Sequence, residues 1–388
     1  MIAVYIHWPF CVSKCPYCDF NSRKGDVSDQ EIWRRAYRRE LEHDADLLSR
    51  QSVGSVFFGG GTPSLMEART VDSVLQDIAR LWSVDKDAEI TLEANPSSAE
   101  SAKFADFRKV GVNRLSLGVQ SLKDDALKFL GRAHNVEQAK NALTLAAKHF
   151  PRFSFDLIYA YRNQTPEIWE QELHSALAYA GDHLSLYQLT IEPQTPFHAH
   201  MQRGEMIASS GDDAAAMFEA TQEIMNAAGL PAYEISNHAR KGHESRHNLT
   251  YWHYEDYIGI GPGAHGRMRI GQTRRAVENI RAPYVWMEHV EAQGYGVKSD
   301  ETLDDITAMR EALMMGLRLT EGIDLNRWRE KFQTPLPDFL SSERLAKLEK
   351  EGLIAKNEKT LRATPAGLQR LNAVLGYLDL GISEFRRA

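Results

Sequence analysis

The sequence predicts an α/β protein in which a partial (β/α)6 barrel is followed by a small α+β module. Six short apolar runs alternate with longer segments of helical spacing, which is typical of a parallel sheet. Polar or glycine residues follow several different strands, and a barrel brings all of those strand ends to one mouth. From about residue 300 the pattern changes to helices and a hairpin, and 388 residues suffice for two or three domains.

The alternating pattern occupies the first part of the chain. Predicted strands cover residues 3–7, 55–58, 89–93, 114–119, 153–159 and 183–191. Predicted helices cover residues 28–50, 69–82, 99–109, 136–149, 166–179 and 212–228. Several strands are continuous β-branched or aromatic runs, as expected where both faces of a sheet are covered. A doubly wound sheet would satisfy the same alternation, but it more often concentrates its ligand residues in one crevice.

The alternation loosens from about Pro231. Residues 259–266 are rich in glycine and predict a loop, and the polar segment 298–302 is a candidate boundary. Beyond it, the spacing predicts helices at 303–317 and 342–351, a hairpin at 352–364 and a last helix at 365–377, as in a winged-helix-like module. The predicted parts are therefore a barrel, a barrel extension and a C-terminal winged-helix-like domain, at residues 1–230, 231–298 and 299–388.

Charge and composition argue against some classes of function. The formal net charge is −7, from 46 basic and 53 acidic residues, which does not favour a general polyanion binder. Residues 341–388 hold nine basic and six acidic side chains, so nucleic-acid binding is the weaker interpretation of this module and no nucleic-acid partner is expected. No apolar run could span a bilayer and no secretory signal is visible. We expect a cytoplasmic protein, with a peripheral membrane contact and a homodimer both left open.

The cysteines carry the strongest chemical signal. The chain has three, Cys11, Cys15 and Cys18, in a C-x3-C-x2-C spacing. They are too few for a disulfide framework and one short of a four-thiolate zinc site. Three thiolates on a short loop suit three irons of a four-iron cluster, which leaves one iron open to another ligand. The alternatives are three small buried side chains, or a zinc site completed by a residue such as His7 or Asp19.

A glycine run follows the second predicted strand. Its sequence is Gly59-Gly60-Gly61-Thr62, and it is neither a dinucleotide-binding fingerprint nor a P-loop. Glycines at such a place let a ligand approach bare backbone N–H groups. A tight strand-to-helix turn would explain the run equally well.

Taken together, these motifs resemble those of the radical S-adenosylmethionine (SAM) superfamily. The similarity begins with Tyr5-Ile-His-Trp-Pro-Phe-Cys11, the cysteine spacing and the glycine run. It continues through Leu92–Pro96, Ser116–Ser121, Gly131–His134 and Phe155–Tyr159, and it extends to the C-terminal module. Within the superfamily the chain resembles the branch that contains the oxygen-independent coproporphyrinogen III oxidase HemN and its relative, the haem chaperone HemW.

The resemblance implies two cofactors. Cys11, Cys15 and Cys18 would hold a [4Fe–4S] cluster, and SAM would chelate the open iron and be cleaved to a deoxyadenosyl radical by one electron. Carboxylates could accept hydrogen bonds from ribose hydroxyls, and an arginine could pair with the SAM carboxylate. The positions that match SAM contacts are Tyr5, Gly60, Gly61, Thr62, Glu93, Gln120, Arg132 and Asp156. Arg132 could instead cap a helix, and Asp156 could be a polar residue satisfied inside its strand.

Two departures distinguish the members of this branch. The oxidase has a further cysteine two residues after the third, where this chain has Phe20, and it has an arm before the tyrosine, where this chain has four residues. Both favour the chaperone. An H-N-x-x-Y-W motif linked to haem binding agrees with this, and it comprises His247, Asn248, Tyr251 and Trp252. Histidine is a common axial ligand of haem and aromatic rings pack on its macrocycle, although a histidine beside aromatic residues is often only a packing residue.

Two functions follow from the resemblance. The first is a haem chaperone that binds haem, through His247 as the expected ligand, and transfers it to acceptor haemoproteins. The second is a radical SAM oxidoreductase that acts on a porphyrinogen or on another substrate. Phe20 counts against porphyrinogen decarboxylation but not against radical chemistry in general. No catalytic residue is assigned in either case.

Overall fold

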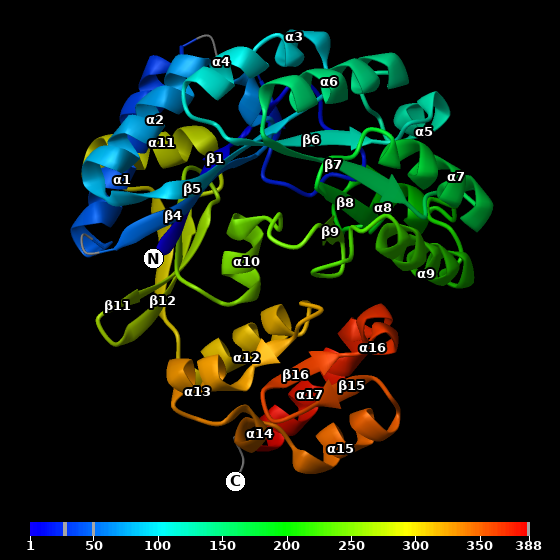
Figure 1. Ribbon diagram of the computed structural model, residues 1–388. Coiled ribbons are helices and arrows are strands. Elements are labelled where there is room, and N and C mark those ends of the chain that lie inside the picture. Colours follow the sequence, from blue (N-terminus) through cyan, green and yellow to red (C-terminus); the bar gives the residue numbers. More distant parts are fainter. Residues whose placement is uncertain (26–28, 49–50, 386–388) are drawn as a thin grey trace.

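The computed structural model describes residues 1–25, 29–48 and 51–385 (Figure 1). Its centre is a mixed sheet of eleven strands. Six of them form the parallel wall of the barrel in chain order: β1 (Ile2–Trp8), β4 (Ser52–Gly60), β5 (Ser83–Ala94), β6 (Arg114–Gln120), β7 (Arg152–Tyr159) and β8 (His183–Gln188). The other five are β9 (Asn237–Ala239), β10 (Tyr257–Ile260), β11 (His265–Ile270), β12 (Thr273–Asn279) and β13 (Val297–Thr302).

The six parallel strands are neighbours in chain order, so each new strand joins the sheet on the same side. A doubly wound sheet would reverse this order, whereas continuous winding in one direction curls the sheet into a barrel wall. Figure 1 shows the crossover helices arranged in an arc on the outer side of this wall. They are α1 (Glu31–Leu48), α2 (Ala68–Leu81), α4 (Phe104–Lys109), α6 (Val136–His149), α7 (Pro166–Leu177) and α9 (Gly211–Ala227). The predicted partial (β/α)6 barrel is confirmed.

Local sequence explains where these helices begin and what they bury. Helix α6 begins with a capping box, in which Asn135 and Gln138 bond each other's backbone N–H groups. Helix α1 buries Trp33, Tyr37 and Leu41 on one face, as its apolar spacing requires. Positions 28, 49 and 50 at the ends predicted for α1 lie outside the described residues. The helix predicted at 99–109 is two pieces, α3 (Ser98–Ser101) and α4.

Short elements complete the barrel. These are β2 (Phe10–Cys11), β3 (Arg23–Lys24), the 3-10 turn Pro63–Leu65, α5 (Asp124–Phe129) and α8 (Pro196–Gln202).

No helix among the described residues is both long enough and apolar enough to cross a membrane.

The extension after the barrel differs from the sequence prediction. It contains α10 (Arg246–Trp252), α11 (Pro283–Gln293) and the strands β10 to β13. Strand β10 joins β1 in parallel, and β11 to β13 continue the sheet as an antiparallel meander. The prediction of a loop over all of 259–266 is wrong, because β10 and β11 occupy both of its ends. The polar segment 298–302 lies in β13, whose polarity suits the exposed edge of a sheet. The predicted division of the chain at 298 therefore falls inside a strand, and the three-part division itself stays a prediction.

The C-terminal module has its own core, around residues such as Leu313, Trp328 and Leu361. Its hairpin is present as predicted and carries a third strand, in the order β14-β16-β15. Helices pack around this small sheet, so the winged-helix-like description is confirmed. Its elements are α12 (Asp305–Gly316), β14 (Ile323–Asp324), α13 (Leu325–Phe332), α14 (Leu336–Phe339), α15 (Ser342–Lys350), β15 (Ile354–Lys356), β16 (Thr360–Ala363), α16 (Pro365–Gln369) and α17 (Leu371–Phe385).

Candidate functional site

An open cavity lies at the carboxyl ends of the parallel strands, beside the cysteine loop; its empty space, including the part open to solvent, is about 1440 Å³. Parallel barrels place ligand-binding residues at this end, because all of the strand-to-helix loops meet there. The lining includes the three cysteines and seven of the eight residues expected to contact SAM. Those seven are Gly60, Gly61, Thr62, Glu93, Gln120, Arg132 and Asp156.

The cysteine loop is anchored to distant parts of the chain. The ring of His7 bonds the carbonyl oxygen of Asn21 through Nε2, at 2.9 Å. The amide of Asn21 in turn donates to the carbonyl oxygens of Pro262 and Arg281, each at 2.9 Å. At the other end of the loop, the Thr62 hydroxyl donates to Cys11 Sγ at 3.5 Å. These contacts between protein groups hold both ends of the loop without a cofactor.

The loop fits the ligand set of a cluster better than that of a single ion. In the described part of the chain, no three His, Cys, Asp or Glu side chains converge on a site for one metal ion. Three thiols that face one cavity without converging suit a cluster, in which each thiolate binds a different iron. His7 does not complete a zinc site, because its two ring nitrogens bond Tyr5 Oη and the carbonyl oxygen of Asn21. Burial raises the pKa of the Cys11 and Cys18 thiols.

Arg132 is directed into the cavity. Its Nη1 lies 3.2 Å from Cys15 Sγ, and its Nη2 donates to Asn95 Oδ1 at 2.5 Å. Within the described structure, its buried Nε has no hydrogen-bond partner. This is not the arrangement of a helix cap. A buried guanidinium with an unused donor next to the cysteine loop can accept a carboxylate from a ligand.

Close packing accounts for the glycine run. Gly60 has a φ of +109°, and a β carbon there would lie 2.9 Å from the backbone oxygen of Trp8. A β carbon on Gly61 would lie 2.5 Å from the backbone oxygen of Phe10. Both glycines therefore let β4 approach the segment that carries the cysteines. Close packing against Trp8 and Phe10 thus accounts for both glycines, and it is compatible with a ligand contact, since both also line the cavity.

Two half-buried carboxyl groups, those of Glu93 and Asp156, line the cavity near each other. Burial, with a smaller contribution from the charge of Asp156, raises the pKa of Glu93 to about 8. Burial also raises the pKa of Asp156 to about 6, although a hydrogen bond to Ser185 opposes the shift. Glu93 Oε2 accepts a hydrogen bond from the backbone N–H of Gly60 at 3.2 Å. Both groups can accept hydrogen bonds from hydroxyls, which is the role expected for a ribose contact.

The raised pKa of Glu93 predicts a pH-dependent stability of the protein without cofactors. The unfolded carboxyl group ionises near pH 4.5, but the folded one stays protonated to about pH 8. Stability contributed by this group is therefore present below pH 4.5 and is lost as pH rises towards 8, by about 2–4 kcal/mol. Glu93→Gln should flatten this part of the profile when urea unfolding is compared at pH 5 and pH 8. Glu137→Gln, on the exposed side of α6, should keep the wild-type profile; identical profiles for both variants would contradict the prediction.

The other predicted SAM residues occupy different settings. Gln120 lines the cavity with a φ of 71°, which is uncommon for a residue with a side chain and is often found at functional sites. Tyr5 does not line the cavity. Its side chain lies inside the barrel, where Tyr5 Oη bonds His7 Nδ1 at 3.1 Å and its ring stacks on Phe57. Its contact with SAM stays a prediction.

The histidine of the proposed haem motif lies in the interior of the protein. His247 is 1% exposed and its ring stacks on Phe57, with 4.9 Å between centroids. Its Nδ1 bonds the Ser55 hydroxyl at 2.9 Å and its Nε2 bonds Tyr251 Oη at 2.7 Å. Burial holds the pKa of His247 near 3, so the ring is neutral. Both nitrogens are occupied in this conformation, and iron ligation by His247 stays a prediction.

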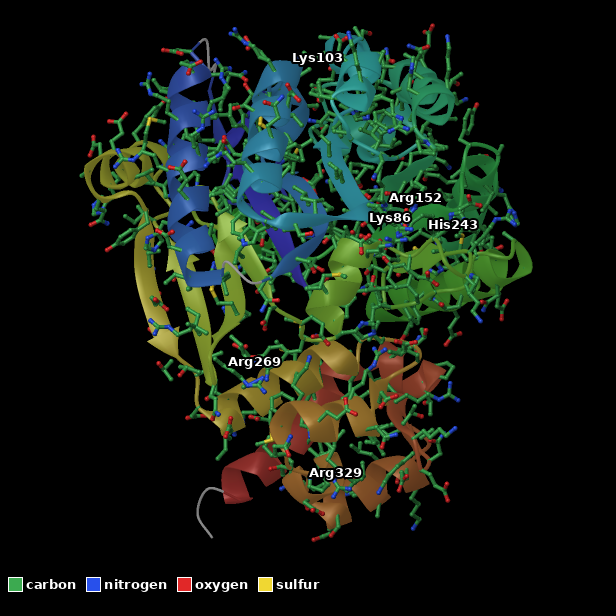
Figure 2. The ribbon with its side chains drawn as sticks, turned by 60° about the vertical axis from the view of Figure 1, so that its left-hand side comes forward. Lys86, Lys103, Arg152, His243, Arg269 and Arg329 are labelled. Carbon is green, nitrogen blue, oxygen red and sulfur yellow. The ribbon has the colours of Figure 1, made fainter. Side chains whose placement is uncertain are left out.

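Helix α10, which carries this motif, is held by one buried carboxylate. Glu89 forms an ion pair with Arg152 at 2.7 Å and accepts a hydrogen bond from the backbone N–H of His247 at 3.2 Å. Arg152 also donates to the carbonyl oxygens of His243 and Glu244. Figure 2 shows Arg152 and His243 next to each other beside α10. No sequence motif identifies Glu89, because its partners are more than sixty residues away along the chain.

The remaining motif residues lie along α10. The backbone N–H of Asn248 bonds the capping Ser245 hydroxyl at 3.3 Å. Tyr251 bonds His247, whereas Trp252 lies at the end of the helix with the guanidinium of Arg318 over its ring, 4.8 Å from the centroid. The structure thus brings His247 and Tyr251 together in the barrel but places Trp252 at the junction with the C-terminal module. Asn21 and Asn95 support the cysteine loop and Arg132, and sequence reasoning assigned neither to the site.

Comparisons with known proteins agree with this geometry. The family described as the radical SAM superfamily matches residues 5–176, and the HemN C-terminal domain matches residues 303–370. The chain is 33% identical over 378 residues to the haem chaperone HemW of Bacillus subtilis, covering 97% of this chain and 98% of the relative. It belongs to the HemN/HemW branch of the radical SAM superfamily. Membership in this superfamily implies the [4Fe–4S] cluster and SAM as cofactors, and the cavity provides residues that fit both.

Other members of the HemN/HemW branch extend the similarity. The mitochondrial radical S-adenosyl methionine domain-containing protein 1 of Bos taurus is 39% identical over 380 residues, covering 96% of this chain and 86% of the relative. HemW of Escherichia coli is 40% identical over 276 residues, which cover 70% of this chain and 72% of the relative. Among solved structures, HemN of Escherichia coli aligns with a TM-score of 0.81 over 97% of this chain and 90% of that chain, at 22% identity. This last match supports the fold shared within the branch.

Proposed function

We propose that this protein is a haem chaperone, which binds haem and transfers it to acceptor haemoproteins from a radical SAM scaffold. The observation that carries the proposal is the similarity to HemW proteins, which in the Bacillus subtilis relative extends over nearly the whole of both chains. Phe20 supports it, because its side chain is 59% exposed at the cavity and cannot supply the additional thiol found in the oxidase. A cytoplasmic location is part of the proposal.

Different residues of the cavity would hold different parts of the two cofactors. A cluster bound by Cys11, Cys15 and Cys18 would supply one-electron chemistry towards SAM when both are present. Arg132 would hold a carboxylate through its unused donor, while the backbone of the glycine run would approach the ligand closely. Glu93 and Asp156 would accept hydrogen bonds from hydroxyls of the ligand and so orient them. In a chaperone, SAM bound by these residues would regulate the transfer of haem.

Haem titration tests the proposal. The wild-type protein should bind haemin, iron(III) protoporphyrin IX, at about one per chain, with a shifted Soret band that identifies specific binding. It should then transfer that haemin to an apo-haemoprotein faster than it releases haemin into solution when no acceptor is present. A protein that binds no haemin stoichiometrically is not a haem chaperone. The motif residues His247, Asn248, Tyr251 and Trp252 are the candidates for contact with the haem.

A second function is favoured by the cavity itself. Beside the cysteine loop it is lined by two carboxyl groups of raised pKa, as is common where an enzyme binds and transforms a substrate. A radical SAM oxidoreductase that acts on a porphyrinogen or another substrate would use such a space. Anaerobic incubation with SAM, dithionite and a candidate substrate distinguishes the two. Release of 5′-deoxyadenosine that depends on the substrate supports the enzyme, whereas its absence with porphyrinogens supports the chaperone.

A further inference from the structure

Gln120 enters the barrel cavity from a strained turn at the end of β6. Its φ of 71° lies in the left-handed region, which a residue with a side chain keeps only where its surroundings hold it there. The amide of Gln120 lies beside Arg132, because a β carbon on Gly118 would be 3.0 Å from Gln120 Nε2 and 3.4 Å from Arg132 Nη2. The strained residue therefore presents its amide next to the guanidinium that is expected to hold the carboxylate of SAM.

Side chains hold the backbone just before Gln120. The carbonyl oxygen of Gly118 accepts a hydrogen bond from Arg132 Nη2 at 2.8 Å. The carbonyl oxygen of Val119 bonds His134 Nε2 at 3.0 Å. Both donors come from the loop that follows α5, so the end of β6 is fixed on its amino-terminal side by groups at the cavity.

One carboxyl oxygen holds the turn that follows Gln120. Glu172 lies in α7, is 2% exposed and is not part of the cavity lining. Its Oε1 accepts hydrogen bonds from the Ser121 hydroxyl at 2.5 Å and from the backbone N–H of Leu122 at 2.7 Å. Ser121 Oγ in turn accepts from the backbone N–H of Lys123 at 3.1 Å. The three residues after Gln120 are thus tied to Glu172, either directly or through Ser121.

The same carboxyl group connects the ends of two neighbouring strands. Burial raises the pKa of Glu172, and Ser121 and Gln164 are among the groups that oppose the shift. Gln164 Oε1 accepts from the backbone N–H of Ala160 at 2.6 Å. Ala160 follows β7 directly and is itself left-handed, with a φ of 60°. Glu172 therefore lies between two strained strand ends, and both strands carry residues that line the cavity.

We propose that Glu172 is a positioning residue of the SAM site, which holds Gln120 in its left-handed conformation so that the amide can bond the ligand beside Arg132. Glu172 does not line the cavity and acts through Gln120. An amide can both donate and accept, so it suits the polar groups of SAM. The inference rests on the predicted contact of Gln120 with SAM and not on haem, so it applies to the proposed chaperone and to the alternative enzyme alike.

Loss of Glu172 should release this turn. In Glu172→Ala, the Ser121 hydroxyl and the Leu122 N–H lose the acceptor that they share, and buried donors are driven to find another partner. Gln120 can then return to an extended conformation, which carries its amide away from its place in the cavity. The cysteine loop has separate anchors, so it should keep its cluster.

SAM binding to anaerobically reconstituted variants of the full-length protein tests the inference. Equilibrium dialysis measures the dissociation constant of SAM, and the electron paramagnetic resonance spectrum of the reduced cluster, with and without SAM, reports the ligand at the iron. Glu172→Ala should keep the wild-type iron and sulfide but bind SAM about tenfold more weakly or worse. Glu172→Gln should stay within about threefold of the wild-type affinity, because both bonds go to Oε1 and glutamine keeps this oxygen. Wild-type affinity in the folded Glu172→Ala protein overturns the inference.

A double variant tests whether Glu172 acts through Gln120. Gln120→Ala alone should weaken SAM binding about as much as Glu172→Ala, and the double variant should bind no more weakly than Gln120→Ala. Losses that multiply would show that Glu172 acts by another route. An unchanged affinity in Gln120→Ala would remove the contact on which the inference rests. Either result contradicts it.

Thr221→Val is the matched control for a general loosening of α7. The Thr221 hydroxyl, buried in α9, accepts from Trp169 Nε1 at 2.8 Å, and Trp169 lies in α7 about one turn before Glu172. Valine has a similar shape but removes this acceptor, and it leaves the bonds of Glu172 in place. The variant should lose stability and still bind SAM like the wild-type protein. Equal weakening of SAM binding in Thr221→Val and Glu172→Ala would assign the effect to stability and overturn the inference.

Ser121→Ala gives a test that does not depend on the folding of Glu172→Ala. It removes one of the two bonds to Glu172 Oε1 and should weaken SAM binding by about threefold. Circular dichroism checks that each variant is folded, and an unchanged affinity in folded Ser121→Ala contradicts the inference. A wild-type protein that binds no SAM would overturn the SAM site itself, whereas failure of the haem titration would overturn the chaperone and leave this inference standing.

Discussion

Cys15→Ser should reduce the iron of the anaerobically reconstituted protein from about four atoms per chain to fewer than about one, with loss of the visible absorption of the cluster. Serine offers a hard oxygen where the iron needs a soft thiolate, and the two remaining cysteines of the chain, Cys11 and Cys18, are themselves expected ligands. Cys15 is also the thiol nearest Arg132, so its loss removes the ligand at the arginine side of the cavity. Iron and acid-labile sulfide assays measure the result.

Ser13→Ala is the matched control for this experiment. It lies in the same loop and lines the same cavity, but it carries no thiol. It should retain the wild-type iron and sulfide. If Cys15→Ser also retained them, the loop would not be the cluster site; if the wild-type protein held zinc instead of iron, the zinc interpretation of the cysteine loop would return.

Glu40→Ala should lower the free energy of unfolding of the barrel by about 3–6 kcal/mol. Glu40 is buried in α1, where one carboxylate oxygen accepts from Trp286 Nε1 at 2.8 Å and the Gly296 backbone N–H at 2.9 Å. The other oxygen accepts from the Gly261 backbone N–H at 2.7 Å. Alanine leaves three buried donors without an acceptor, and each costs about 1–3 kcal/mol. Urea unfolding followed by tryptophan fluorescence measures the change, since Trp286 is one of the affected groups.

Glu42→Ala separates this effect from a general change in helix α1. Glu42 is on the same helix but is exposed, and its ion pair with Arg80 at 2.7 Å is shared with solvent. Its removal should cost less than about 1 kcal/mol. Burial raises the pKa of Glu40 to about 7, so Glu40→Gln, which keeps one acceptor oxygen, should be less harmful than alanine. Equal losses for Glu40→Ala and Glu42→Ala would show that the three hydrogen bonds contribute little.

The barrel could be predicted from the sequence because its strands are covered on both faces. The run from Ile2 to Trp8, for example, is buried at nearly every position, and such runs stand out against the amphipathic helices around them. The strands β11 to β13 could not be found in this way. They lie towards the edge of the sheet, where polar residues such as those of Val297–Thr302 are tolerated on both faces.

In the candidate site, too, some residues could be predicted from the sequence and others could not. The cysteines, the glycine run and Arg132 were predicted from motifs, and the structure brings them to one cavity. The residues that support them could not be found, because Asn21, Glu40 and Glu89 bond groups that are distant in sequence. A motif also does not reveal whether a side chain is available. The aromatic residues around His247 suggest a ligand, but its two ring nitrogens are occupied by the hydroxyls of Tyr251 and Ser55.

The pairing of the first strand has a consequence for how the protein is made. Strand β1 is synthesised before both of its neighbours, β4 and β10, and β10 ends at Ile260. The amide of Asn21, which anchors the cysteine loop, bonds backbone oxygens as far along the chain as Arg281. During synthesis at about 5–20 residues per second, the loop therefore waits on the order of ten seconds or more for its last anchor. Metal delivered to the nascent chain would meet thiols on a loop that is not yet anchored, so we expect the cluster to be assembled after translation of the barrel extension.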